Sequence, residues 1–128
     1  MSDDKAVVLE LIDGFNSIDL DRIVACFTED AVYDNIPMQA VQGTEAIRAS
    51  LEGFMGAASE VQWDLLNVVG EGGVVLTERI DKFKVNGTWI ELPVMGTFEV
   101  ADGKIKAWRD YFDLAQFQTQ FAKATGAQ

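Results

Sequence analysis

The chain of 128 residues contains no histidine. This absence excludes a histidine general base, the serine–histidine and cysteine–histidine pairs of nucleophilic catalysis, and metal sites built from imidazole ligands. Any acid–base chemistry must therefore use carboxylates, lysine or tyrosine.

Cysteine and long apolar runs are also scarce. Cys26 is the only cysteine, so no intrachain disulfide can form, and its place in the apolar run 23–27 indicates a buried structural thiol. No apolar run approaches the roughly 20 residues that span a bilayer. The first residues carry neither the basic nor the apolar segment of a secretory signal. We therefore expect a cytoplasmic protein.

Basic residues are few, with 10 Lys and Arg against 21 Asp and Glu and a formal net charge of −11. Nucleic acids and anionic membranes are bound through basic patches, so we expect neither as a partner. Hydrophobic residues make up 48% and charged residues 24% of the chain. This composition and length predict one globular domain, residues 1–128, with room for a core and one ligand-sized cavity.

Apolar spacing predicts helices early in the chain and strands late. Helices are expected at 4–15, from a cap at Asp19 to residue 27, from an N-cap at Thr44 to about 55, and at 114–124. Strands are expected at 31–36, 60–69, 74–85, 88–100 and 105–112, with hairpin turns at Asn86-Gly87 and Asp102-Gly103. In the strand 60–69, alternation places Val61, Trp63, Leu65 and Val69 on one face.

The resulting order, α-α-β-α-β-β-β-β-α, predicts an α+β fold in which N-terminal helices pack on one curved antiparallel sheet. Such a sheet can wrap around a helix and form a cone-shaped pocket. The layout resembles the nuclear-transport-factor-2-like, or cystatin-like, fold, a scaffold that hosts enzymes, binders and assembly modules alike. Apolar residues on both faces of the sheet favour a homodimer.

Polar side chains interrupt two apolar strand faces. Alternation places Arg79 and Asp81 on the same face as apolar neighbours, and it places Asp110 between Trp108 and Phe112. A carboxylate buried between two aromatic rings is costly without a partner, so we expect Arg79 to pair with Asp110.

Two carboxyl groups around one guanidinium would carry a net negative charge if both ionised. One of them should therefore retain a proton. One protonated and one ionised acid in the same pocket is the arrangement that general acid–base catalysis needs. The same cluster also fits a structural ion-pair network that only fixes the strand register.

Tyr33 and Asn35 share a strand face by their spacing of two, whereas Asp34 points the other way. A phenol and a carboxamide near an ionised carboxylate can hold one water molecule in a fixed orientation. Alone, the pair also fits a strand end with turn-forming residues.

Together these residues form a familiar set. Tyr33-x-Asn35-x-Pro37, Arg79-x-Asp81 and Asp110 within the run 108–113 resemble the limonene-1,2-epoxide hydrolase family, and the resemblance spans nearly the whole chain in element order. It implies one-step hydrolysis of a hydrophobic epoxide to a vicinal diol, with no cofactor, no metal and no covalent intermediate. The main departure is a short N-terminus.

Carried over residue by residue, the resemblance implies a role for each polar group. Tyr33, Asn35 and Asp110 would bind the attacking water, with Asp110 as the general base. Asp81 would be the general acid that protonates the epoxide oxygen, and Arg79 would orient both aspartates. Ring strain already weakens the electrophile, so a positioned water, a base and an acid suffice.

The surrounding apolar residues suggest a pocket for a terpene-like, alicyclic or aryl epoxide. The candidates for its lining are Leu76, Phe83, Leu92, Val94, Met95, Phe98, Trp108, Phe112 and Leu114, with Ile36, Met38 and Ile80 in addition. The flexible methionines suit a pocket of irregular shape.

Two other functions remain open. A ketosteroid-isomerase-like enzyme or a SnoaL-like polyketide cyclase could use Asp110 and Asp81 for proton shuttling at a carbon acid. The steroid isomerases, however, use a tyrosine from the first helix, where this chain has Phe15. A non-catalytic small-molecule-binding module would need the polar cluster only for its structure.

Overall fold

Four helices flank the sheet in the computed structural model, which describes residues 4–126. They are α1 (Asp4–Asn16), α2 (Leu20–Val24), α3 (Thr44–Ala57) and α4 (Leu114–Ala124). α1 buries Val8, Leu11, Ile12 and Phe15, an apolar stripe with helical spacing. Residues 1–3, on which part of the expectation about a secretory signal rests, lie outside the described residues.

Six strands form one sheet in the order β2-β1-β6-β5-β4-β3. They are β1 (Phe27–Asn35), β2 (Val41–Gln42), β3 (Glu60–Glu71), β4 (Val74–Val85), β5 (Thr88–Ala101) and β6 (Lys104–Tyr111). The predicted α+β class and element order are confirmed, with the two-residue strand β2 in addition. We predicted a purely antiparallel sheet. This prediction is wrong, because β1 and β6 pair in parallel.

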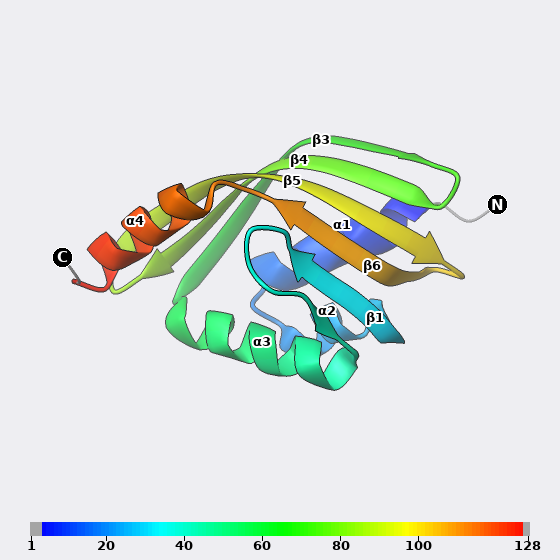
Figure 1. The fold of residues 1–128 in the computed structure, drawn as a ribbon, viewed down its shortest axis with the longest axis horizontal. Coiled ribbons are helices and arrows are strands. Elements are labelled where there is room, and N and C mark those ends of the chain that lie inside the picture. Colours follow the sequence, from blue (N-terminus) through cyan, green and yellow to red (C-terminus); the bar gives the residue numbers. More distant parts are fainter. Residues whose placement is uncertain (1–3, 127–128) are drawn as a thin grey trace.

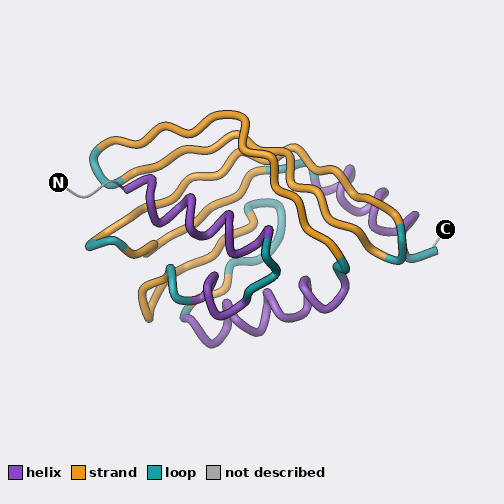
Figure 2. The backbone as a smooth tube through the Cα atoms, turned by 180° about the vertical axis from the view of Figure 1, so that it is seen from behind, coloured by secondary structure: helices purple, strands orange, loops and turns teal. Residues whose placement is uncertain are grey.

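The sheet is strongly curved, and its concave side faces the first three helices (Figure 1). α1 packs mainly against β3 and α2, and α3 lies against β1 and α2. Seen from behind, α1 crosses the inner face of the strands, and α3 lies below α1 in this view (Figure 2). α4 packs against β5. Helix and strand residues together line a cavity on the concave side.

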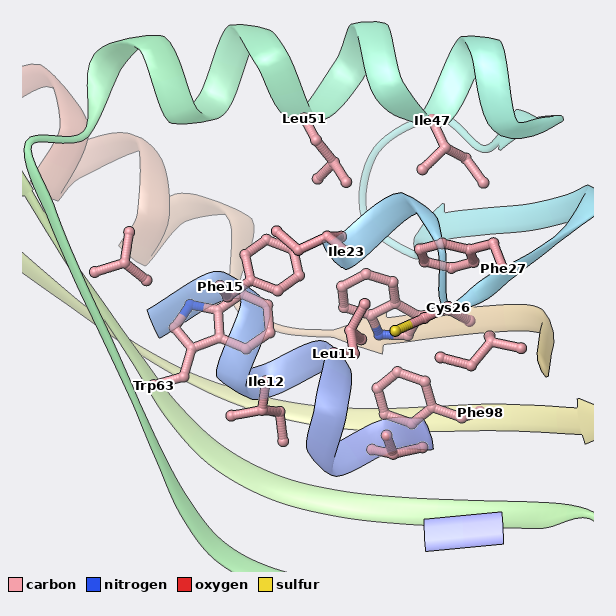
Figure 3. Close-up of a cluster of buried hydrophobic side chains, with 14 of the residues drawn as sticks. Leu11, Ile12, Phe15, Ile23, Cys26, Phe27, Ile47, Leu51, Trp63 and Phe98 are labelled. Carbon is pink, nitrogen blue, oxygen red and sulfur yellow. The ribbon is translucent and has the colours of Figure 1, made fainter. Parts of the chain in front are cut away.

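The core occupies part of the concave side, between α1, α3 and the sheet (Figure 3). Phe15 of α1 stacks on Trp63 of β3 with the ring centroids 4.0 Å apart. Trp108 of β6 is completely buried and stacks against Phe98. The aromatic centre of the core therefore joins the helices to the strands that carry the polar residues.

Both predicted hairpin turns are confirmed. Asn86 and Gly87 have φ values of 51° and 78°, and Asp102 and Gly103 have 51° and 75°. Positive φ at both central residues is the requirement of a two-residue turn that matches strand twist. These turns hold β4, β5 and β6 in one antiparallel meander.

Three local predictions are wrong. The second helix ends at Val24 and not at residue 27, because Phe27 begins β1, where its ring packs on Trp108. The N-cap of α3 is Gly43 with φ 91°, not Thr44, which is the first helical residue. In β3 the register shifts between Leu65 and Asn67, and past this bulge Val68 packs on the core while Val69 is exposed.

Candidate active site

The parallel pairing of β1 with β6 places the polar end of β1 beside Asp110. Asn35 lies opposite Asp110, and Tyr33 lies opposite Trp108. The backbone N–H of Ile36 donates to the carbonyl oxygen of Asp110 at 2.9 Å, which ties the end of β1 to this position. Residues that are 75 positions apart in the chain are thereby brought side by side on one face.

The next strands continue the same row across the sheet. Asp110 lies opposite Gly96 of β5, and Gly96 lies opposite Thr77 of β4. A Cβ atom on Gly96 would lie 2.5 Å from Nη1 of Arg79 and 2.6 Å from Oδ1 of Asp110. The missing side chain leaves the space through which the guanidinium of Arg79 reaches Asp110.

Arg79 joins the two carboxyl groups directly. Its Nη2 donates to Oδ2 of Asp110 and to Oδ2 of Asp81, both at 2.8 Å, and its Nε donates to Oδ1 of Asp81 at 2.9 Å. Its Nη1 donates to Oγ1 of Thr77 at 2.9 Å. Arg79 is completely buried, yet every nitrogen of its guanidinium is paired. Burial opposes its charge, but the two carboxylates outweigh burial and raise the pKa of Arg79.

Asp110 is held by a second donor. The indole Nε1 of Trp108 donates to Oδ1 of Asp110 at 2.7 Å. Each carboxylate oxygen of Asp110 therefore has one fixed partner, and each keeps acceptor capacity for a further hydrogen bond. Asp110 is buried from bulk solvent but lines the cavity described below. It is thus oriented and still accessible to a small molecule in that cavity.

The other carboxyl group favours its protonated form. Burial raises the pKa of Asp81 to about 6, helped by the negative charge of Asp110 and opposed by Arg79. The expected division into one protonated and one ionised acid is consistent with this direction.

Tyr33 lies flat on Trp108, with ring centroids 4.3 Å apart. Burial, followed by repulsion from Asp110, raises the pKa of the Tyr33 phenol, while its hydrogen bond with Asn35 acts in the opposite direction. The phenol therefore keeps its proton at neutral pH and can donate a hydrogen bond. Tyr33, Asn35 and Asp110 line the same cavity.

The cavity on the concave side has a volume of about 240 Å³. Its polar lining comprises Tyr33, Asn35, Ser50, Asp81 and Asp110, and its apolar lining comprises Phe15, Met38, Leu51, Phe54, Trp63, Phe83, Leu92, Val94, Phe112 and Phe117. A mostly apolar cavity with a few convergent polar groups is the usual form of a small-molecule site.

The five predicted polar residues meet at this cavity. Arg79 lies directly behind two of the lining residues, to which it is hydrogen-bonded. The other four are in the lining itself: Tyr33, Asn35, Asp81 and Asp110. Among the predicted apolar residues, the lining includes Met38, Phe83, Leu92, Val94 and Phe112. The other apolar predictions need correction.

Leu76, Ile80 and Met95 do not line the cavity, because strand alternation turns them to the convex face; Leu76 and Met95 are 41% and 51% exposed. Phe98 and Trp108 are completely buried in the core behind the polar cluster. Leu114 and Ile36 are also absent from the lining, since Leu114 opens α4 and Ile36 is partly exposed beyond the end of β1.

Sequence reasoning missed several residues of the site. The helices contribute Phe15, Ser50, Leu51, Phe54 and Phe117 to the lining. Their helical spacing showed an apolar face but not which part of the face would meet the cavity. Gly96 had a usable signal, because a glycine inside a strand marks a close approach.

Strand alternation placed Trp63 only on a common face with Val61, Leu65 and Val69. It lies opposite Asp81 in the β3–β4 pairing, and its ring lies 4.7 Å from Cζ of Arg79. Such contact between a guanidinium and an aromatic face adds an attraction to the buried cation. Trp63 thus supports the cluster and lines the cavity at the same time.

Metal and membrane signals are not found in the described part of the chain. Within residues 4–126, no group of three or more Cys, Asp or Glu side chains is arranged to hold a metal ion. Among those residues, no helix has the length and apolar character that crossing a membrane requires.

Comparison with known proteins identifies a consistent set of relatives. Residues 2–123 match the family model of the limonene-1,2-epoxide hydrolase catalytic domain. The epoxide hydrolase EphG of Mycobacterium tuberculosis is 30% identical over 106 residues, which cover 80% of this chain and 68% of the relative.

Solved structures agree with this similarity. An epoxide hydrolase from M. tuberculosis, described as similar to the limonene-epoxide enzymes, superposes with a TM-score of 0.83 at 26% identity and covers 96% of this chain and 92% of its own. A SnoaL-like protein from Shewanella denitrificans OS-217 gives the same TM-score at 15% identity, covering 94% and 97% of the two chains, and this likeness concerns the fold alone.

Proposed function

Because this chain belongs to the limonene-1,2-epoxide hydrolase family, we propose that it is a cofactor-independent epoxide hydrolase that converts a small hydrophobic epoxide to a vicinal diol. The observation that carries the proposal is the Asp81–Arg79–Asp110 cluster in the polar wall of an otherwise apolar cavity. The raised pKa of Asp81 supports a role of this acid as the proton donor.

The proposed reaction is a single displacement. Tyr33, Asn35 and Asp110 hold one water molecule, whose oxygen attacks a carbon of the epoxide while Asp110 removes a proton from the water. The carbon–oxygen bond of the epoxide breaks in the same step, and Asp81 donates its proton to the leaving oxygen. Water is thereby added across the ring, and no bond forms between the substrate and the protein.

Turnover leaves Asp110 protonated and Asp81 ionised. The starting state returns when a proton passes from Asp110 to Asp81, either directly across the gap that the diol vacates or through water entering the cavity. Arg79 stays cationic throughout because both carboxyl groups raise its pKa. Its contacts of 2.8 Å to both acids keep their geometry fixed in either protonation state.

The cavity supports a small hydrophobic substrate. Its volume of about 240 Å³ lies below the roughly 300–1,000 Å³ of sites for drug-sized ligands. Ten of its fifteen lining residues are apolar, so a terpene-like, alicyclic or aryl epoxide fits its chemistry better than a polar one.

Isotope labelling tests the proposed reaction. A panel of alicyclic and aryl epoxides is incubated in ¹⁸O-labelled water with an excess of protein, so that each molecule turns over once. We expect label in the diol from this first turnover, because water attacks directly. Unlabelled diol would instead reveal a carboxylate ester on the protein and overturn the one-step mechanism.

Substitution tests the assignment of Asp110. Asp110→Asn removes the base but keeps the shape, and we expect diol formation to fall by at least about 100-fold while the fold, followed by circular dichroism, is retained. Asp34→Asn is the matched control, because Asp34 does not line the cavity. Full activity of Asp110→Asn would show that the cluster is structural.

The raised pKa of Asp81 beside Asp110 is also the observation that would suit a ketosteroid-isomerase-like enzyme or a SnoaL-like cyclase. Proton shuttling at a carbon acid gives no role to Arg79 between two acids, and α1 presents Phe15 to the cavity in place of a tyrosine. Isomerised enone or aldol product without diol formation would favour this alternative.

We also propose that two copies of the chain associate through the convex face of the sheet. Val69, Leu76, Met95 and Tyr111 are exposed there by 41–60%. Met95 lies opposite Tyr111, and Leu76 lies opposite Val69, so the four residues form two apolar pairs on this face. An exposed group of large apolar side chains on a sheet face is typical of a protein–protein contact.

A further inference from the structure

Six of the seven aromatic rings that line the cavity, all except Tyr33, form an unbroken arc. In order along the arc they are Trp63, Phe15, Phe54, Phe83, Phe117 and Phe112. The successive ring centroids lie 4.0, 6.5, 4.8, 6.3 and 6.2 Å apart. Five elements and the segment after β6 contribute one ring each, so the arc depends on the tertiary fold and not on any one motif.

The rings of the arc present both faces and edges. The Phe54–Phe83 and Phe112–Phe117 pairs meet at 70° and 76°, whereas Phe15 and Trp63 are nearly parallel at 16°. An aromatic face is negative and an aromatic edge is positive, so mixed orientations can receive the edge and the face of a further ring. A saturated ring has no such polarity and gains only the contact area.

Two rings of the arc lie close to the acids along the chain. Phe83 follows Asp81 by two residues on one face of β4, and Phe112 follows Asp110 by two, directly after the end of β6. Side chains two residues apart along a strand are separated by about 6.5–7 Å. An epoxide held between the two acids therefore directs its substituent toward Phe83 and Phe112 within the length of one ring.

From this geometry we infer that the substrate is an aryl epoxide, with a phenyl-sized ring attached to the oxirane directly or through one carbon. The inference rests on the proposed epoxide hydrolysis and specifies the substrate class for that site. The volume of about 240 Å³ accommodates one such ring.

A matched pair of substrates tests the preference. Benzyloxirane and (cyclohexylmethyl)oxirane differ only in the aromaticity of the ring, and the methylene group separates the ring from the epoxide, so the two have similar intrinsic reactivity. We expect kcat/KM for diol formation to be higher for benzyloxirane by roughly fivefold or more, because several ring contacts contribute.

Two substitutions on the same helix connect the preference to the arc. Phe117→Leu should lower the ratio of the two kcat/KM values by roughly two- to tenfold, because it removes the contacts of one ring and retains an apolar side chain. Phe121→Leu lies one turn further along α4, outside the cavity lining, and should keep the ratio close to that of the wild type. Phe54→Leu on α3 provides an independent second variant.

The outcomes separate this inference from the proposed function. Equal kcat/KM values for the two epoxides would overturn the aryl inference and leave the hydrolase function intact. If no epoxide is hydrolysed, calorimetry measures the binding of 3-phenylpropane-1,2-diol and of its cyclohexyl counterpart. Tighter binding of the phenyl diol supports an aryl site without hydrolase function. Equal or absent binding overturns both the aryl inference and the hydrolase function.

Discussion

Arg79 is the residue around which the site is organised. Its buried guanidinium is fully paired, and it binds one oxygen of Asp81 and one of Asp110 through the same nitrogen. A buried cation between two acids requires that their combined charge be reduced, and the raised pKa of Asp81 provides this reduction through a retained proton. The protonation state of Asp81 should therefore control both activity and stability.

The pH dependence of activity follows from Asp81. A general acid must carry its proton, so we expect kcat/KM to fall as pH rises through about 6, by about tenfold for each further pH unit. The measurement is a pH profile of kcat/KM with a fixed epoxide, which reports the free enzyme. A profile that stays level from pH 5 to pH 8 would contradict the role of Asp81 as the acid.

The same proton affects stability in a definite direction. The pKa of Asp81 is raised on folding from its ordinary value of 3.8, so the folded protein binds this proton more tightly than the unfolded chain. This stabilisation is fully present below about pH 4 and is lost as pH rises through about 6. The pH profile of the free energy of unfolding should therefore differ between wild type and Asp81→Asn within that window.

Gly96 is a positioning residue for the cluster. In Gly96→Ala the new Cβ would overlap Arg79 and Asp110, so we expect activity to fall by at least about 100-fold. Displacement of Arg79 would also remove the interaction that lowers the pKa of Asp81, so the alkaline limb of the pH profile should move to higher pH. Loss of stability alone would not move that limb.

Gly53→Ala is the matched control for this substitution. A Cβ on Gly53 meets nothing within 4 Å, and the residue lies inside α3. We expect this variant to keep full activity and to gain about 0.5–1 kcal/mol of stability from helix propensity. Unchanged activity and pH profile of Gly96→Ala would show that the cluster tolerates a shifted guanidinium.

At the scale of elements, most of the predicted polar site followed from strand alternation. It placed Tyr33 with Asn35 and Arg79 with Asp81 on common faces, as the structure shows. Alternation could not supply the pairing of β1 with β6, because parallel pairing joins residues far apart in the chain and leaves no turn signal. The bulge in β3 was equally hidden, and it moved Val69 to the exposed side.

Helix periodicity was less informative about the cavity. The helices that carry Phe15, Phe54 and Phe117 each have an apolar face, but a face that covers the core and a face that lines a cavity have the same period. Only the angle at which each helix crosses the sheet distinguishes the two. Strand alternation has a similar limit, because core-facing and cavity-facing residues share one face of a strand. Phe98 and Trp108, which are completely buried, were therefore predicted as lining residues.

The start of α4 offers a test of how helix position affects the cavity. The side chain of Asp113 accepts a hydrogen bond from the backbone N–H of Gln116 at 3.1 Å and caps the helix that carries Phe117. Asp113→Ala should lower the free energy of unfolding by about 0.5–2 kcal/mol. We expect KM to rise more than kcat falls, since Phe117 lies in the lining and not in the polar cluster.

Asp113→Asn serves as the control for the cap, because asparagine caps helices about as well as aspartate. It should retain stability in urea unfolding and KM close to those of the wild type. Equal loss in both variants would assign the effect to the charge of Asp113 and not to the cap.

At the scale of the whole molecule, the order of elements followed from turn signals and apolar periodicity, which are local properties. The missing histidine limited acid–base chemistry to carboxylates, lysine or tyrosine, and the structure places two aspartates around Arg79. Which acid carries the proton depends on burial and on distances across strands, so the residues alone left it open. The cytoplasmic location stays a prediction.

The proposed association of two chains through the convex face can be tested by substitution. Met95 is 51% exposed and lies in the centre of this face, beside Tyr111. If two copies associate here, Met95→Lys should weaken the dimer by about 1–3 kcal/mol, because a charge would be buried against its symmetry mate. Sedimentation equilibrium measures the dissociation constant directly. Leu9→Lys on α1, an equally apolar and 41% exposed position away from the sheet face, is the control.

Because the chain carries a net charge of −11, repulsion between copies opposes association, so added salt should strengthen a dimer of the wild type. A wild-type chain that stays monomeric at high protein concentration and high salt would contradict the proposed interface.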